Sequence, residues 1–189
     1  MAKLDRATVL QAAAELANTE GLKSLSLKNL AEKLGVRSPS LFKHIQGLED
    51  LHTALMLYGW KQLGDCVIMS AVGKAGDNAA RAMCKAYYDY AKANPGIFES
   101  MMWINQNSSP EAQQATIQLA KLVALVLESY QLDEQAQIHA SRMIRSFLQG
   151  FSSIVNNGSF VDPVPVDESF YYGVDLLIAG IKSKKAKGM

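Results

Sequence analysis

The stretch that most constrains the fold covers residues 30–51, LAEKLGVRSPSLFKHIQGLEDL, because it combines a helix end and a new helix start within a few residues. Ser26 precedes the stretch as a helix N-cap, and Gly35 stands where a helix end favours a left-handed backbone. Between them, four apolar residues recur at the i, i+3, i+4 and i+7 spacing of one helix face: Leu27, Leu30, Ala31 and Leu34. The pattern predicts a short amphipathic helix that ends at a tight turn.

A second helix is expected directly after this turn. Ser38 is the predicted N-cap and Pro39 the first helical residue, where the missing proline N–H is tolerated. This helix should bury Leu41 and Ile45, and it should turn Ser40, Lys43 and His44 outward. Two helices with this spacing form a helix-turn-helix, which presents its second helix to the DNA major groove.

The charge of this region favours nucleic acid over a purely structural role. Two short amphipathic helices joined by a glycine also occur in many other all-helical proteins, so the apolar pattern alone leaves both interpretations open. Between residues 23 and 43, however, Glu32 is the single acid, and the cations are Lys23, Lys28, Lys33, Arg37 and Lys43. The chain as a whole carries a net charge of only +1, so its positive charge is concentrated locally. Exposed Arg, Lys and Ser side chains suit phosphate and base-edge contacts.

The remainder of the 189 residues predicts further helices and almost no strands. We expect an all-α fold of about nine helices, with a three-helix N-terminal DNA-binding unit and a larger C-terminal helical domain. The expected helices cover residues 5–21, 27–34, 38–45, 48–69, 78–93, 98–103, 110–130, 133–157 and 167–181. The expected domains are 1–47 for DNA binding, 48–73 as a connecting helix, 74–182 for ligand binding and dimerisation, and 183–189 as a basic disordered tail.

The last two long helices predict a dimer interface. Both carry strong apolar stripes with small residues among them, which permits close helix packing. Such helices either bury themselves in their own domain or form a four-helix bundle with a second copy. Dimerisation also suits a helix-turn-helix that recognises an inverted repeat. The candidate interface residues are Phe151, Ile154, Val174, Leu177, Ile178 and Ile181.

A segment rich in Tyr, Met and Trp precedes these helices. With a few polar groups among them, such residues can line a pocket for an uncharged, largely apolar ligand. The same residues at helical spacing can instead fill a core, and the sequence leaves both interpretations open. The candidate ligand-binding residues are Tyr87, Tyr88, Met102, Trp103, Phe147 and Gln149.

Several classes of protein are not favoured. The sequence shows no paired catalytic carboxylates, no nucleophile with a His base and no His cluster, so we expect neither an enzyme nor a metal or cofactor site. Cys66 and Cys84 are expected to be buried, reduced thiols, because a thiol sensor needs exposure and a lowered pKa. No apolar run approaches the length of a membrane span, and no signal peptide is evident, so a cytoplasmic location is expected.

The N-terminal region resembles the tetracycline-repressor (TetR) family of transcriptional regulators. The resemblance rests on AELANTEG at 14–21 and LSLKNLAEKLGVRSPSLFKHIQGLEDL at 25–51. Residues 141–160 and 166–180 are similar to the family branch whose regulatory domain contains a WHG region. Gln149 stands in place of the signature histidine of that region, and its tryptophan is missing.

The resemblance implies a homodimer that inserts its third helix into the major groove and whose C-terminal domain binds an effector. Phe42 departs from the tyrosine usual in the motif and is expected to pack against a sugar or a thymine methyl, and Leu48 replaces a frequent cation. The candidate DNA-binding residues are Ser26, Lys28, Arg37, Ser38, Pro39, Ser40, Phe42, Lys43 and His44. The expected function is a repressor released from a palindromic operator by a small, largely apolar ligand. The alternative is a DNA-localised interaction protein that acts through a protein partner.

Overall fold

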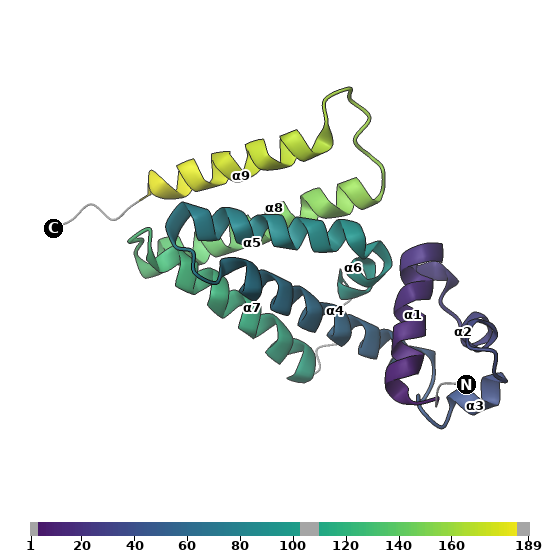
Figure 1. The fold of residues 1–189 in the computed structure, drawn as a ribbon. Coiled ribbons are helices and arrows are strands. Elements are labelled where there is room, and N and C mark those ends of the chain that lie inside the picture. Colours follow the sequence, from purple (N-terminus) through teal and green to yellow (C-terminus); the bar gives the residue numbers. More distant parts are fainter. Residues whose placement is uncertain (1–3, 103–109, 185–189) are drawn as a thin grey trace. The chain divides into compact units, whose positions relative to one another are not determined.

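A computed structural model describes residues 4–102 and 110–184 (Figure 1). Within these residues the chain forms nine α-helices and no strand, which confirms the predicted all-α fold. The helices are α1 (Arg6–Glu20), α2 (Leu27–Lys33), α3 (Ser38–Leu41), α4 (Leu48–Ala71), α5 (Gly76–Ala93), α6 (Pro95–Met101), α7 (Pro110–Glu128), α8 (Glu134–Asn156) and α9 (Val166–Lys182), with a 3-10 turn η1 (Leu22–Ser24) after α1. No described helix combines the length and apolar character needed to cross a bilayer.

Local sequence signals set several of the helix ends. The carboxylate of Asp5 caps α1 by accepting the N–H of Thr8 at 2.8 Å. The hydroxyl of Ser26 caps α2 by accepting the N–H of Asn29 at 3.1 Å. Gly35 has a φ of +65°, a left-handed conformation that favours glycine. The Ser26 cap and the turn at Gly35 were expected from the sequence, whereas for the first helix the sequence predicted only a start near residue 5 and not the Asp5 cap.

The start of α3 differs by one residue from the prediction. Arg37, rather than Ser38, is the N-cap, so Ser38 is the first helical residue and Pro39 the second. No side chain caps this helix. Proline is tolerated throughout the first turn because those N–H groups have no partner within the helix. The proline signal therefore locates the helix start only to within about a residue.

The described chain divides into two compact units, which are considered separately. Unit 1 holds Met1–Gln62 and Asn94–Ala115, and unit 2 holds Leu63–Ala93 and Thr116–Met189. Compact units and functional domains are defined differently, so the domain boundaries expected at 47, 73 and 182 stay a prediction.

In unit 1, α6 packs directly on α1. A Cβ added at Gly96 would lie 2.0 Å from the carbonyl oxygen of Ala17, so only glycine permits this approach. The side chain of Asn18 accepts hydrogen bonds from the N–H groups of Gly96 and Ile97 at 3.1 and 3.0 Å. Two N–H groups at the start of α6, which have no partner in their own helix, are thereby satisfied from α1.

In unit 2, α5, α8 and α9 lie side by side (Figure 1). An aromatic cluster fills the space between them, with Phe170 fully buried at its centre. The ring centroids of Phe170 and Tyr88 are 4.0 Å apart in a stacked arrangement, and those of Phe170 and Phe147 are 5.7 Å apart. A Cβ at Gly173 would meet the Phe147 ring at 2.5 Å, so this glycine lets α9 approach α8 closely.

The two cysteines, both in unit 2, differ in exposure. Cys84 is buried, and its burial raises the pKa of its thiol to about 12. Cys66 is exposed on α4, so the prediction that both thiols are buried is wrong for this residue. Apolar neighbours along a helix do not decide which face of the helix a residue occupies, and this caused the error.

Candidate nucleic-acid interface

The helix-turn-helix in unit 1 is held together by a small apolar contact set between α2 and α3. Leu30 and Ala31 of α2 are buried, and so is Leu41, which is fully inaccessible to solvent. Ile45 follows the end of α3 and is also buried. The N–H of Val36 donates to the carbonyl of Ala31 at 3.0 Å and closes the turn between the helices. The burial of Leu41 and Ile45 confirms the inward face predicted from the sequence.

The recognition segment, residues 38–45, presents its other face to solvent. Regular α-helix covers only Ser38–Leu41, and the N–H groups of His44 and Ile45 both return to the carbonyl of Leu41 in a tight turn. Phe42 is 57 % exposed, an unusual exposure for a large aromatic side chain. Among the other candidates of this segment, Pro39 and Lys43 are exposed, and Ser38, Ser40 and His44 are half-buried.

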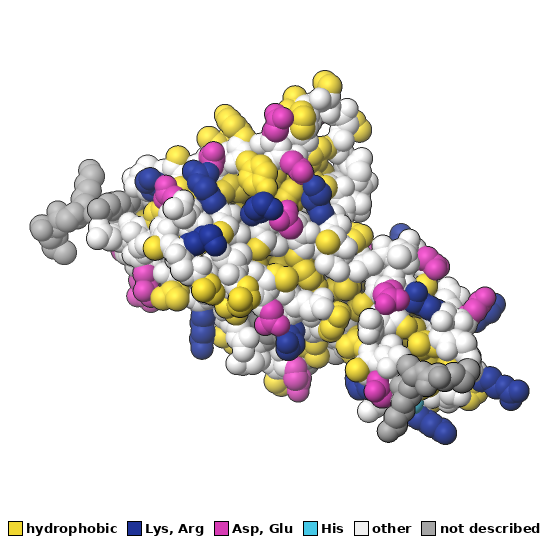
Figure 2. Space-filling model, viewed as in Figure 1, with side chains coloured by type: hydrophobic (Ala, Val, Ile, Leu, Met, Phe, Trp, Pro, Cys, Tyr) yellow, Lys and Arg dark blue, Asp and Glu magenta, His cyan; other side chains and the backbone are white. Residues whose placement is uncertain are grey.

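The cations of the helix-turn-helix fall into two groups. Lys33 pairs with Glu15 of α1 at 3.3 Å. Lys28, Arg37 and Lys43 are exposed and form no ion pair with any residue that the structure describes. Dark blue Lys and Arg side chains project into solvent from the α2–α3 part of unit 1 in Figure 2. An exposed cation without an internal partner can neutralise a phosphate without first breaking another contact.

Ser26, one of the DNA-binding candidates, caps α2. The hydroxyl oxygen of Ser26 accepts the N–H of Asn29, whose side chain donates to the carbonyl of Ser24 at 2.8 Å. Arg6 and Asp50 of this unit, which were not among the candidates predicted from the sequence, form a forked ion pair. No local pattern could signal that pair, because its members are 44 positions apart in the chain.

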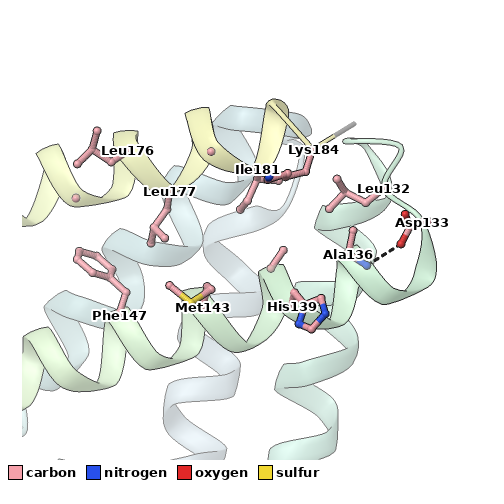
Figure 3. A pocket seen from close by; sticks show the side chains of 13 residues that line it. Leu132, Asp133, Ala136, His139, Met143, Phe147, Leu176, Leu177, Ile181 and Lys184 are labelled. Carbon is pink, nitrogen blue, oxygen red and sulfur yellow. Dashed lines mark hydrogen bonds between the residues drawn. The ribbon is translucent and has the colours of Figure 1, made fainter. Parts of the chain in front are cut away.

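A second candidate surface lies in unit 2, where α8 and α9 enclose an open apolar groove of about 710 Å³ (Figure 3). Leu177 on α9 points towards Met143 and Phe147 on α8 across this groove. The groove continues towards His139 and Lys184 at its other end. A groove of this size with an apolar lining is suited to an apolar occupant.

The predicted interface residues of α8 and α9 do not share one environment. Val174, Ile178 and Ile181 are buried within unit 2, whereas Leu177 and Phe151 are half-buried and Ile154 is 41 % exposed. The most exposed apolar side chains of the two helices were not among the predicted interface residues; they are Ile138, Met143, Tyr172 and Leu176. An apolar stripe shows that a helix is amphipathic, but both faces of α9 are apolar, so sequence could not separate the inner face from the outer one.

The candidate ligand-binding residues are distributed over both units. Tyr88 and Phe147 come together in the aromatic cluster of unit 2, where the Tyr88 hydroxyl donates to Asp167 at 2.7 Å. Burial raises the pKa of both Tyr87 and Tyr88. Gln149 is half-buried on α8, and Met102 is half-buried in unit 1. Trp103 lies outside the described residues.

Comparisons with known proteins point to one family. Residues 80–177 match the family model described as the tetracyclin repressor-like C-terminal domain. The chain is 31 % identical over 178 residues to the HTH-type transcriptional regulator YobS of Bacillus subtilis, covering 94 % of this chain and 93 % of YobS. It is 32 % identical over 191 residues to the HTH-type transcriptional regulator Rv0681 of Mycobacterium tuberculosis, covering 99 % of this chain and 86 % of that protein.

A solved structure extends this likeness to the fold. A TetR variant from Acinetobacter baumannii in complex with minocycline superposes with a TM-score of 0.74 at 20 % identity, and the match covers 98 % of this chain and 100 % of that one. At this identity the likeness concerns the fold of the chain.

Proposed function

The chain belongs to the tetracycline-repressor family of transcriptional regulators, and on that premise we propose that it is a repressor that binds an inverted-repeat operator as a homodimer. Regulators of this family bind DNA and dimerise, and they are not enzymes. The observation that carries the proposal is the solvent-facing side of the helix-turn-helix, where Lys28, Arg37 and Lys43 are exposed and form no ion pair within residues 4–102 and 110–184.

The recognition segment supplies contacts of different kinds. Arg37 and Lys43 flank the exposed face and reach base edges or the nearest phosphates, whereas Lys28 on α2 meets a phosphate. Ser38, Ser40 and His44 add hydrogen-bonding groups near the same surface. Phe42 brings an exposed ring without a hydroxyl, which suits a thymine methyl or a sugar better than a phosphate.

The dimer forms through α8 and α9. The outer faces of both helices expose large apolar side chains, with Met143 and Leu176 each 57 % accessible to solvent. A second copy that packs its own α8 and α9 on these faces would complete a four-helix bundle and cover the groove between them. Two helix-turn-helix units would then be held at the spacing that an inverted repeat requires.

The effector is a small, largely apolar molecule. The structural relative from Acinetobacter baumannii holds minocycline, which shows that a chain of this fold can take a drug-sized ligand. In unit 1 the indole N–H of Trp60 is buried and makes no hydrogen bond to any residue that the structure describes. A buried donor without an acceptor costs free energy, so we add Trp60 to the candidate ligand contacts.

Selection from a randomised DNA duplex library tests the operator proposal. The unaltered protein should enrich an inverted repeat, and its affinity for the selected duplex should fall steeply with salt because counterions are released from the phosphates. Equal affinity for the selected and a scrambled duplex at physiological salt would reject the proposal.

A second measurement separates the repressor from the interaction protein. A library of apolar, drug-sized compounds is screened for release of the selected duplex. An effector must change DNA affinity by the same factor by which DNA changes effector affinity. If no compound meets this reciprocity, the interaction-protein alternative becomes the better account.

A further inference from the structure

Arg6 and Asp50 form the most extensive polar contact in the described part of unit 1. The Arg6 guanidinium donates to both carboxylate oxygens of Asp50, at 2.8 and 3.0 Å. This forked arrangement fixes the relative orientation of two planar groups as well as their distance. Because Arg6 opens α1 and Asp50 lies in the first turn of α4, the pair joins two helices that are far apart in the chain.

The same two side chains also hold the end of the recognition segment. Arg6 donates a third hydrogen bond, at 2.8 Å, to the carbonyl oxygen of His44. Asp50 accepts the backbone N–H of Gln46, also at 2.8 Å. These two backbone groups lie on either side of Ile45, just after Lys43. We call the Arg6–Asp50 pair the clasp.

A four-residue helix needs such external support. α3 is too short to be stable by its own hydrogen bonds. The burial of Leu41 and Ile45 holds the segment down, but apolar contacts are non-directional and leave some freedom of rotation. Hydrogen bonds to the backbone at His44 and Gln46 remove that freedom, because each requires a defined distance and direction.

The clasp residues are poorly suited to bind DNA themselves. The Arg6 charge is matched by Asp50, and the pairing raises the pKa of Arg6 and lowers the pKa of Asp50. Asp50 carries a negative charge in the unit that approaches the phosphates, so electrostatics alone would favour its removal.

We propose that Arg6 and Asp50 are positioning residues for sequence recognition, which orient the recognition segment by clasping its C-terminal end between α1 and α4. This inference rests on the proposed function, since it concerns how the same DNA-binding surface selects a sequence. It assigns no contact with DNA to either residue. Its effect is therefore on the ratio of specific to non-specific affinity.

The direction in which Asp50→Ala changes the affinity for DNA distinguishes a positioning role from an effect of charge. Asp50→Ala removes an acid and should tighten DNA binding if charge alone matters. The clasp predicts the opposite for the selected duplex: an affinity weaker by on the order of tenfold, with affinity for a scrambled duplex unchanged or higher. Arg6→Lys keeps the charge but loses the forked geometry, and it should show the same loss of specificity.

Glu49→Ala is the matched control, since it removes an acid from the same turn of α4 at an exposed side chain outside the clasp. It should not weaken binding to the selected duplex. Thermal unfolding of each variant reports the folded fraction. Asp50→Ala binding the selected duplex as tightly as the unaltered protein, or losing affinity for both duplexes in equal proportion, would overturn the inference and leave the proposed function intact. Failure of the unaltered protein to select any sequence would overturn the proposed function and the inference with it.

Discussion

The helix-turn-helix and the α8–α9 pair present opposite kinds of surface. In the helix-turn-helix, helices of 7 and 4 residues bury Leu30 and Leu41 and expose cations. In the α8–α9 pair, helices of 23 and 17 residues bury one apolar face and leave further apolar side chains exposed. Exposed charge is well solvated while its partner is absent, whereas exposed apolar area is costly until it is covered. The first surface therefore suits a partner that binds reversibly, and the second suits a permanent partner.

The largest effect is expected from breaking the apolar surface. Leu176→Glu places a charge on the exposed face of α9, where the separate subunit tolerates it but a bundle with a second copy does not. Sedimentation should show a monomer. Affinity for the selected duplex should fall by a factor of about 10² to 10⁴, because one helix-turn-helix loses the effective concentration provided by the other.

Leu125→Glu is the control for this substitution. Leu125 is 61 % exposed on α7, close to the 57 % of Leu176, and it lies outside the proposed interface. This variant should remain a dimer. If Leu176→Glu is still a dimer, the interface lies elsewhere. The exposed apolar surface of α8 and α9 would then not be the permanent interface that distinguishes it from the DNA-binding surface.

A smaller effect is expected from the charged surface, because each cation supplies one contact among several. Arg37→Ala and Lys43→Ala should each weaken binding to the selected duplex by about 1–3 kcal/mol if they reach base edges. Titration of labelled duplex at constant salt measures this. Lys121→Ala removes a cation from an exposed position of α7 and should leave the affinity unchanged. If the three variants behave alike, the exposed cations of the helix-turn-helix have no special role.

The smallest effect concerns how α9 is held to α5. Lys92 donates to Asp167 at 2.7 and 3.0 Å, and Tyr88 donates to the same carboxylate. These contacts hold the pKa of Asp167 below its ordinary value of 3.8, with the Lys92 hydrogen bond as the largest cause. Because the pKa of this carboxyl is lower in the folded protein, its ion pair stabilises the fold at pH values above the ordinary pKa. This contribution is lost as the pH falls through the lowered pKa.

Asp167→Asn should therefore lower the free energy of unfolding by at most about 1 kcal/mol near neutral pH, since the carboxylate is 56 % exposed. Its deficit relative to the unaltered protein should shrink below about pH 4. Glu168→Gln, a change at the neighbouring exposed carboxylate, is the matched control for the removal of a negative charge from the first turn of α9. Thermal unfolding at a series of pH values measures both. A deficit that is independent of pH would mean that the ion pair does not contribute.

Much of the helix-turn-helix was predictable because its signals are local. The cap at Ser26, the left-handed Gly35 and the inward Leu41 and Ile45 each depend on neighbours a few positions away. The prediction of the start of α3 was one residue off, because proline is tolerated at both the first and the second helical position. It was wrong for Cys66, whose apolar neighbours did not show which face of α4 it occupies.

Periodicity, capping and turn residues act over short stretches of chain, so the helices, the helix-turn-helix and the family resemblance could all be predicted from the sequence. Which stripe of α9 is covered within the subunit depends on the folded chain, in which Ile178 is buried and Leu176 is exposed. Only the tertiary structure brought Arg6 to Asp50 and to the backbone beyond Lys43. Burial and long-range hydrogen bonds depend on which segments the folded chain places side by side, and no local pattern encodes that choice.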